Sequence, residues 1–487
     1  MSLEPTPLPA DAEGTPPQPS AEPGGLDAGL FAPRRRQLVV GLVLTVTLVA
    51  FEAMAIAAIM PDVKDDLGGL GLYGWVFSGF FLGSLLGIVV AGQLADSRGL
   101  VLPYVVGLGL FTTGLLIGGG AVSMPVLVVG RVLQGFGAGA IPAIGYTAVG
   151  RGIPGPLRPK MFAVMSTAWV VPGLVGPSAA LLVEHVLSWR AVFLVLVPLV
   201  LLAGVMTVPA LATMGPPEGV DADDVEHRER RAAQALRLRQ VVLLVVGVGA
   251  AFAAVSGVPG VVAATLVLFG VPLAVNALVH LLPAGTLRLD RGIPATVAVR
   301  GILTFGFFAA DAYVPLAVVD GRGGSSWIAG AALTVSALTW TAGSWIQARS
   351  IDQVGPQRLD RIGFGALAVG IALMLGVALG LPVGLAVVAW AVSGFGIGIA
   401  YAPQAVTVLA SAKPGEEGKA SAAIQLSDAV GIALGTGVAG GVISIGDGRG
   451  WPVDHSVTWV FVLALGGALG GVLASGRIPE RVPAQAT

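Results

Sequence analysis

The sequence predicts an all-α membrane protein, and three observations support that fold class. Hydrophobic residues make up 55% of the 487 residues, charged residues only 11%, and the mean hydropathy is +0.86. Soluble domains carry roughly 25% charged residues. The charges fall mostly in short clusters between long apolar segments, and the chain contains no cysteine. These features exclude an ordinary soluble protein and thiol chemistry, and a net charge of −1 gives no basic surface for nucleic acid.

Fourteen apolar segments are long enough to cross a hydrocarbon core of about 30 Å, which takes roughly 20 helical residues. They follow an N-terminal segment rich in Pro and Gly that has no apolar block and so is not a signal peptide. The predicted spans are residues 38–60, 71–95, 101–121, 125–150, 161–184, 190–213, 240–258, 260–282, 293–319, 326–348, 360–381, 383–411, 418–444 and 456–475.

The basic residues predict the orientation, because cytoplasmic loops retain Lys and Arg. With the N-terminus inside, the segments on the cytoplasmic side hold 21 of the 27 Lys and Arg residues, and the outer segments hold four. We therefore expect both termini to be cytoplasmic. Among these basic residues Arg far outnumbers Lys, which together with the Ala, Val and Gly content indicates a bacterial protein, multi-pass in the plasma membrane.

An internal repeat with a constant offset of 259 residues divides the chain into two halves. The matching pairs are 135–139 with 394–398, Glu52 with Asp311, and Gly176 with Gly435. We expect two six-helix bundles related by a pseudo-two-fold repeat, plus two extra central helices. Transporters built from two such halves bind substrate near the midplane and alternate access between the two sides. A channel is less favoured because no filter-like sequence is present.

The predicted segments are a disordered cytoplasmic tail, a six-helix bundle, a cytoplasmic linker, two extra helices, a second six-helix bundle and a cytoplasmic tail. In that order they cover residues 1–36, 37–213, 214–239, 240–283, 293–476 and 477–487. None of the soluble segments is large enough for a nucleotide-binding domain, and none carries a phosphate-binding loop. We therefore expect no enzyme activity and no cofactor, with an ion gradient as the energy source.

Three motifs mark the N-terminal half. Residues 92–99 lie between the second and third spans, where glycines allow close helix approach, the acid is expected to cap the next helix, and the Arg to pair across a gate. A degenerate copy at 352–355 lies three residues off the repeat register. The residues that carry the three motifs are Gly92, Asp96, Arg98 and Gly99; Arg131 with the Gly-rich stretch 134–139; and Pro172, Gly173, Gly176 and Pro177.

In these spans and in this order, the motifs resemble those of the major facilitator superfamily, and within it the fourteen-span drug:proton antiporters. The resemblance covers about residues 36–476 and implies the fold of that superfamily, alternating access and proton-coupled export. Two stretches depart from the family pattern. Leu-Val-Leu at 100–102 stands in place of basic residues of the gate motif, and Ala-Ala at 179–180 in place of the Gly pair that ends the antiporter motif.

Glu52, nine positions before Pro61, is similar to an acid of fourteen-span exporters that the family implicates in proton or cationic-substrate handling. An ionisable group inside a span is by default a functional hypothesis. Glu52 lies roughly 13 Å inside the outer end of its span, and Arg131 lies roughly 9 Å inside the same face. We expect an alternating Glu52–Arg131 pair that loosens when a proton or a cation competes. The alternative is a static ion pair.

Two further acids are embedded in the C-terminal half. Asp311 has Trp390 at the position that corresponds to Arg131, so it lacks that basic partner and is the better candidate for reversible protonation. The alternative for Asp311 is an acid that faces water at a helix end. Asp428 lies about ten residues into the thirteenth span and is expected to line a cavity. Arg300, near the inner end of its span, is expected to extend toward the membrane interface.

Several residues are weaker candidates for an apolar substrate cavity, since aromatic residues in helices also pack against other helices or lipid. They are Trp169, Trp340, Trp390, Tyr401 and Gln425. Taken together, the residues predict a monomeric, proton-coupled exporter of hydrophobic or cationic small molecules, with protons and the lipid bilayer as its other partners. The alternatives are an exporter of a lipid or endogenous metabolite, or a non-transporting receptor or assembly protein of the same fold.

Overall fold

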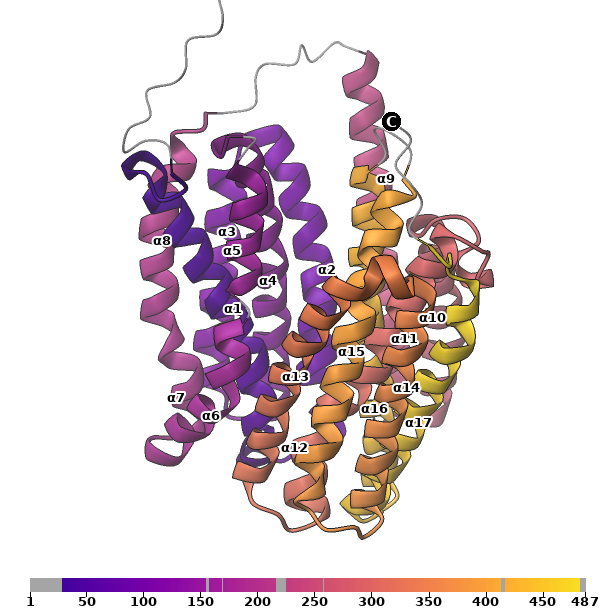
Figure 1. The fold of residues 1–487 in the computed structure, drawn as a ribbon. Helices are drawn as coiled ribbons and strands as arrows, with labels where there is room; N and C mark the ends of the chain where they lie inside the picture. The colour runs from indigo at the N-terminus through magenta and orange to yellow at the C-terminus, as the bar shows by residue number, and fades with distance from the viewer. Residues whose placement is uncertain are drawn as a thin grey trace, which may run out of the picture.

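In the computed structural model the described residues are 29–154, 157–168, 170–215, 225–256, 258–412 and 417–481, and all their regular elements are helices (Figure 1). Most of the predicted N-terminal tail, the first part of the linker and Trp169 lie outside these ranges. The N-terminal half consists of α1 (Pro33–Leu67), η1 (Leu70–Leu72), α2 (Tyr73–Arg98), α3 (Val101–Gly119), α4 (Met124–Gly152), α5 (Arg158–Thr167), α6 (Val170–Val186), α7 (Trp189–Leu194) and α8 (Leu196–Ala212).

Two long helices and a short turn separate the halves. These are α9 (Val225–Ala254), α10 (Gly260–Leu281) and η3 (Thr286–Arg288). The C-terminal half consists of α11 (Ile293–Asp311), α12 (Val314–Leu316), the π-helical turn η4 (Ala317–Gly321), α13 (Ser326–Val354), α14 (Pro356–Ala378), α15 (Leu385–Ala410), α16 (Glu417–Gly448), α17 (Val453–Ala474) and η5 (Ser475–Arg477). Helix α9 begins inside the segment predicted as linker and continues without a break into the first extra span.

The two halves repeat the same helix pairing. In the N-terminal half, α2 and α3 both pack on α4, and α1 contacts α6 and α8. In the C-terminal half, α13 and α14 both pack on α15, and α11 contacts α16 and α17. Each half thus builds one bundle with equivalent neighbours, as the 259-residue offset predicts.

Glycines allow the closest of these contacts. A Cβ added at Gly135 of α4 would lie 1.9 Å from the carbonyl oxygen of Phe80, and one at Gly394 of α15 would lie 2.2 Å from that of Ser336. No side chain fits at such distances, so only glycine permits this helix approach. Phe80 and Ser336 are 256 residues apart, the same displaced register as the second copy of the gate motif at 352–355.

Twelve helical stretches of the described residues are long and apolar enough to cross a membrane. The two other predicted spans, 161–184 and 326–348, correspond to α5 with α6 and to α13. The first of these is divided, because α5 ends at Thr167 and α6 runs on from Val170. Fourteen crossings and cytoplasmic termini therefore stay predictions.

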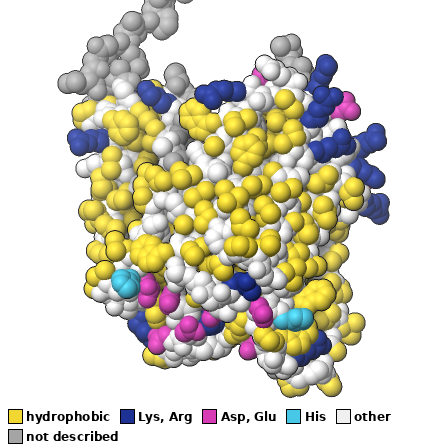
Figure 2. All heavy atoms as spheres, turned by 60° about the horizontal axis from the view of Figure 1, so that its bottom comes forward, with side chains coloured by type: hydrophobic (Ala, Val, Ile, Leu, Met, Phe, Trp, Pro, Cys, Tyr) yellow, Lys and Arg dark blue, Asp and Glu magenta, His cyan; other side chains and the backbone are white. Residues whose placement is uncertain are grey.

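The surface agrees with a membrane protein. Hydrophobic side chains cover the middle of the face in Figure 2, while Lys and Arg gather toward its upper edge and acidic side chains toward the lower. Exposed apolar residues such as Leu268, Phe269 and Val205 are 67%, 68% and 71% exposed. An apolar surface of this extent marks contact with lipid or another protein. The protein is a multi-pass membrane protein.

Both described chain ends lie at the upper end of the bundle in Figure 1, which we call the terminal end; the opposite end is the loop end. The two halves meet toward the loop end. Tyr73 donates a hydrogen bond to the carbonyl of Ala312 (3.4 Å), and Lys64 pairs with Asp320. A Cβ added at Gly74 would lie 2.4 Å from the Cα atom of Gly440.

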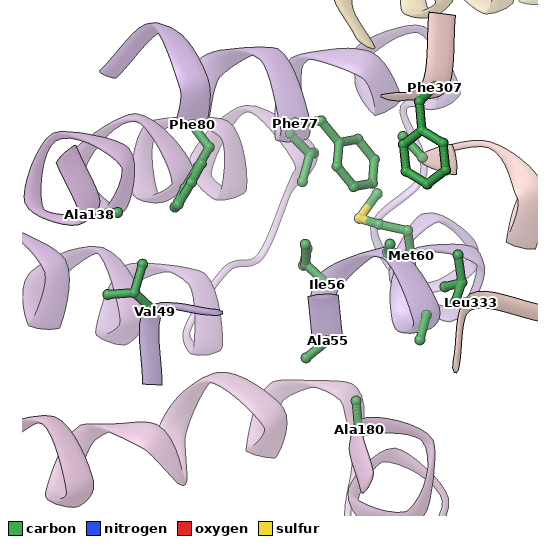
Figure 3. Close-up of a cluster of buried hydrophobic side chains, with 14 of the residues drawn as sticks. Val49, Ala55, Ile56, Met60, Phe77, Phe80, Ala138, Ala180, Phe307 and Leu333 are labelled. Carbon is green, nitrogen blue, oxygen red and sulfur yellow. The ribbon is translucent and has the colours of Figure 1, made fainter. Parts of the chain in front are cut away.

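The buried apolar core crosses from one half to the other. Figure 3 shows side chains of α1 and α2, among them Met60 and Phe77, near Phe307 of α11 and Leu333 of α13. Each of these four side chains is at most 7% exposed. The halves are therefore held together at the loop end by packed side chains as well as by polar contacts.

Candidate functional site

A buried ionic network occupies the N-terminal half, and we call Glu52, Arg131 and Gln134 the N centre. The Arg131 Nη1 atom donates to Glu52 Oε1, and Arg131 Nε donates to the carbonyl of Val76 (3.0 Å). Gln134 Nε2 also donates to Glu52 Oε1, at 3.3 Å. The side chains of Arg131 and Glu52 are 2% and 3% exposed. The predicted contact between Glu52 and Arg131 is confirmed, and the pair is sealed from solvent.

The local structure explains how the N centre is held. Arg131 stands one turn before the glycines of α4, and the Phe80 ring of α2 lies 4.3 Å from its guanidinium carbon. Because Gly135 brings α2 against α4, both the Val76 carbonyl and the Phe80 ring reach Arg131. The second carboxylate oxygen of Glu52 is buried and has no hydrogen-bond partner among the described residues. In the N centre, Glu52 Oε2 can therefore accept a further hydrogen bond.

Asp311 is the last residue of α11, and its carboxylate accepts a hydrogen bond from a tryptophan. Trp390 Nε1 donates to Asp311 Oδ1 at 2.7 Å. Trp390 itself is fully buried and stacks on Phe307, with ring centroids 5.8 Å apart. The sequence comparison that placed Trp390 opposite Asp311, where Arg131 stands in the other half, is thus confirmed in space. Asp311 is half-buried rather than open to water at a helix end.

A second ionic network lies in the C-terminal half, toward the terminal end. Arg300 Nε donates to Asp428 Oδ1 (2.8 Å), and the Tyr401 hydroxyl donates to Asp428 Oδ2 (3.0 Å). Arg300 also lies over the Tyr401 ring, with 3.1 Å between its guanidinium carbon and the ring centroid, and donates to the Tyr401 carbonyl. The expectation that Arg300 extends to the membrane interface is wrong. Its side chain is 6% exposed, because an acid on α16 offers a buried partner.

Two residues that the sequence reasoning missed complete this network. Gln404 Nε2 donates to Asp360 Oδ2 (3.3 Å), and Arg300 Nη1 lies 3.5 Å from Gln404 Oε1. Asp360 is fully buried, and its Oδ1 has no hydrogen-bond partner among the described residues. We call Arg300, Asp360, Tyr401, Gln404 and Asp428 the C centre. The sequence signal for Asp360 is an acid at the start of a predicted span, a position that is equally typical of an acid facing water.

The gate motif is arranged differently from the expectation. Asp96 lies within α2 and does not cap α3; its carboxylate accepts a hydrogen bond from Gln234 of α9 at 2.9 Å. Arg98 is the last residue of α2 and is exposed, and Gly99 follows at a φ of 78°, which favours glycine. Because α2 continues two residues past Asp96, the acid faces α9 instead of the next helix. Gly92 lines a cavity between α2, α9 and α16.

The antiporter motif lies on α6, between the two halves. A Cβ added at Gly173 would lie 3.1 Å from the Cβ atom of Ala337 on α13, and one at Gly176 would lie 3.7 Å from that of Met54 on α1. Pro172 precedes these glycines, and Pro177 lies inside the same helix. Farther along α6, the Ser178 hydroxyl lies 3.5 Å from that of Thr334 on α13. The small residues thus let α1, α6 and α13 approach one another.

The predicted cavity residues separate into three groups. Trp390 is fully buried in the core and stacks on Phe307. Trp340 packs on Phe307 and Tyr401, with ring centroids 5.5 Å and 5.4 Å apart, so both aromatics belong to packed helix contacts. Gln425 lines the cavity of about 250 Å³ between α2, α9 and α16, together with Asp96 and Arg237. Trp169 lies outside the described residues.

Comparison with known proteins assigns the chain to a family. Residues 42–436 match the family model of the Major Facilitator Superfamily, so the chain belongs to that superfamily. It is 28% identical over 457 residues to a probable multidrug-efflux transporter of Mycobacterium tuberculosis, covering 90% of this chain and 93% of that protein. A multidrug transporter of Bacillus subtilis is 29% identical over 170 residues, covering 35% of this chain and 31% of its own length.

Solved structures support the fold alone. A D-xylose–proton symporter superposes with a TM-score of 0.63 at 15% identity, covering 91% of this chain and 98% of its own. An auto-inhibited peptide transporter of the POT family gives a TM-score of 0.65 at 14% identity, covering 93% and 99%. The family, the embedded charges and the paired bundles together define a membrane transporter and not an enzyme.

Proposed function

We propose that this protein is a proton-coupled exporter of hydrophobic or cationic small molecules, acting as a monomer in the bacterial plasma membrane. The observation that carries the proposal is the pair of embedded ionic networks, the N centre and the C centre. Placing a charged group inside a membrane span is costly, and such groups mark ion and substrate pathways. The multidrug-efflux relatives make small apolar molecules the favoured substrates.

The two centres differ in access, which suggests how alternating access is coupled to protons. The halves contact each other near the loop end, and the carboxylate of Glu52 is sealed there. Asp428, toward the terminal end, keeps 20% of its side chain exposed. In our proposal the C centre exchanges ligands in this state, and opening of the loop end then exposes the N centre and Asp311.

A cofactor is not required in this scheme, since the proton gradient supplies the energy. Export of a lipid or an endogenous metabolite would use the same fold, but the relatives whose names state an activity are multidrug transporters, so that alternative is not favoured. Inserting charged groups into a membrane costs free energy, and a non-transporting receptor would have no use for the embedded acids Glu52, Asp311, Asp360 and Asp428.

The proposal is tested by transport in proteoliposomes. Purified protein is reconstituted, and movement of the lipophilic cation tetraphenylphosphonium is followed with and without an imposed pH gradient. We expect the gradient to accelerate transport against the direction of proton flow, and a protonophore to abolish the acceleration. Transport that is indifferent to the gradient would contradict proton coupling and favour a lipid exporter or receptor.

A further inference from the structure

We propose that the C centre exchanges a cation for a proton: a cationic ligand binds Asp428, Arg300 moves to Asp360, and Asp360 releases its proton. This inference rests on the proposed function and adds a named pair of carboxylates to it. It is carried by the position of Asp360, a fully buried acid joined to Arg300 only through Gln404.

The charges of the C centre are not balanced. Two carboxylates, Asp360 and Asp428, share the C centre with a single guanidinium, that of Arg300. A buried carboxylate without a cationic partner is strongly unfavourable, and such a group takes up a proton instead. Arg300 is engaged with Asp428, and one oxygen of Asp360 has no hydrogen-bond partner among the described residues. The C centre is therefore most stable with its extra proton on Asp360.

The two acids of the C centre differ in solvent exposure. Asp428 keeps 20% of its side chain exposed, one turn beyond Gln425, which lines the cavity between α2, α9 and α16. Asp360 is 0% exposed. The acid that lines the cavity itself is Asp96, whereas Asp428 lies three residues beyond the lining residue Gln425. Of the two acids of the C centre, only Asp428 is exposed to an approaching cation, so only Asp428 can bind it directly.

Gln404 bridges Arg300 and Asp360. Gln404 accepts toward Arg300 through Oε1 and donates to Asp360 through Nε2, so its amide stands between the guanidinium and the second carboxylate. In the proposed exchange, a change in the side-chain conformation of Arg300 replaces Asp428 by Asp360 as its partner. Tyr401 donates to Asp428 and lies under the guanidinium of Arg300 in the starting position.

The exchange balances in charge and protons. Before binding, Asp428 is ionised against Arg300, and Asp360 carries a proton. After binding, Asp428 is ionised against the ligand cation, Asp360 is ionised against Arg300, and one proton has left the C centre. One monovalent cation therefore enters for each proton released, and Arg300 is never left without a counter-ion.

Among the described side chains, the charged or titratable ones on helices that pack around α16 are Arg300 and Asp311 on α11, Tyr401 on α15, Tyr73, Asp96 and Arg98 on α2, Arg237 and Arg239 on α9, and Asp454 and His455 on α17. Around Asp360 there are in addition Arg358 and Arg361 on α14 itself, Arg349 and Asp352 on α13, Asp320 in η4 and Arg477 in η5. Among them only Arg300 and Tyr401 hydrogen-bond to Asp428. Nothing in the repeated N-terminal half matches the arrangement, because Gly41 stands at the place of Arg300 and Val101 at that of Asp360.

The experiment counts protons released when the purified full-length protein binds tetraphenylphosphonium in weakly buffered solution with a pH indicator. Cation binding is measured in parallel by equilibrium dialysis. For the wild-type protein we expect roughly one proton per bound cation, from the exchange described above. Asp360→Asn should bind the cation with little or no proton release, because the residue that holds the proton is gone. Asp428→Asn should weaken binding at least about tenfold, as expected for loss of a buried charge partner.

Matched variants separate this mechanism from general damage. Asp447→Asn removes an exposed acid at the other end of α16 and should behave like the wild-type protein. Gln404→Met cuts the bridge without changing the charge and should reduce proton release; it also serves if Asp360→Asn does not purify as a folded protein. Proton release that is unchanged in both Asp360→Asn and Gln404→Met would overturn the proposal, as would a wild-type protein that binds no cation. Proton release without gradient-driven transport in liposomes would instead refute the proposed export function.

Discussion

The N centre and the C centre occupy equivalent bundles of a duplicated fold, yet they are built in different ways. In the N centre, Arg131 comes from α4 and holds Glu52 of α1 with both side chains at most 3% exposed. In the C centre, Arg300 comes from α11 and holds Asp428 of α16, which is 20% exposed. The repeat therefore keeps the helix packing and the acid pair Glu52 and Asp311, but it does not keep the placement of the buried arginines.

The difference in depth is also informative. Arg131 is the eighth residue of α4, counted from the loop end, whereas Arg300 is the eighth residue of α11, counted from the terminal end. The two guanidinium groups thus lie toward opposite ends of the bundle. In the proposed alternating-access scheme, opening of one end would therefore reach one of the two ionic networks before the other.

The largest expected effect concerns the stability of the two centres. Arg131→Met leaves Glu52 buried without a cation, which costs about 3–5 kcal/mol of unfolding free energy. Arg300→Met should cost less, because Asp428 is partly exposed and keeps the Tyr401 hydroxyl. Both are measured by unfolding in mixed detergent micelles. Arg190→Met, which breaks the exposed pair with Asp66, is the control and should cost at most about 1 kcal/mol. Equal losses of unfolding free energy in Arg131→Met and Arg300→Met would contradict the predicted difference in stability between the N centre and the C centre.

The packing that the halves share should respond equally to substitution. Gly135→Ala and Gly394→Ala each force a Cβ onto a backbone carbonyl and should destabilise by about 1–3 kcal/mol. Gly109→Ala and Gly365→Ala are matched controls at helical glycines with open space around them, and they should be neutral or slightly stabilising. Thermal unfolding in detergent measures all four. If only one half were sensitive, the repeat would not extend to helix packing.

Substitution of Asp311 should change transport more than it changes the stability of the fold. Asp311→Asn keeps a side-chain oxygen to accept from Trp390 Nε1, so the fold should remain. The variant can no longer gain or lose a proton, and substrate release should lose part of its dependence on pH. A titration of tetraphenylphosphonium release against pH measures this. A curve that coincides with the wild-type curve would remove Asp311 from the coupling path.

The smallest expected effect lies at the contact between the halves. Lys64→Gln breaks the pair with Asp320 but leaves the apolar packing around Met60 and Phe77 intact, so unfolding should change by at most about 1 kcal/mol. The same variant should open the loop end more often, which is measured by hydrogen exchange of η1 and η4. The absence of native cysteines also permits labelling of Lys64→Cys without background. Unchanged exchange would show that the Lys64–Asp320 pair does not restrain the loop end.

Much of this architecture was predictable from sequence because membrane spans leave a direct signal in composition. The helices, the repeat and the Glu52–Arg131 contact followed from apolar length, the 259-residue offset and depth along the helices. Side-chain direction around a helix did not follow. Arg300 was expected at the interface and Asp96 as a helix cap, because spacing along one helix does not reveal which neighbouring helix the side chain faces.

Asp360 shows most clearly that the position of a residue along one helix does not reveal the partner of its side chain. Its position at the start of a span is compatible with water or with a buried partner, and only the packing of α15 against α14 brings Gln404 to it. The break between α5 and α6 was likewise invisible, because apolar composition continues through it. Composition predicts which segments enter the membrane, whereas contacts between helices decide which charges act together.

Gradient-driven transport by Asp428→Asn, compared with the wild-type protein in proteoliposomes, tests the central claim most directly. The account places cation exchange at the C centre, so it predicts that an imposed pH gradient accelerates tetraphenylphosphonium transport by the wild-type protein but not by Asp428→Asn. Acceleration of the same size in both proteins would show that the Arg300–Asp428 pair is structural, and it would contradict the account.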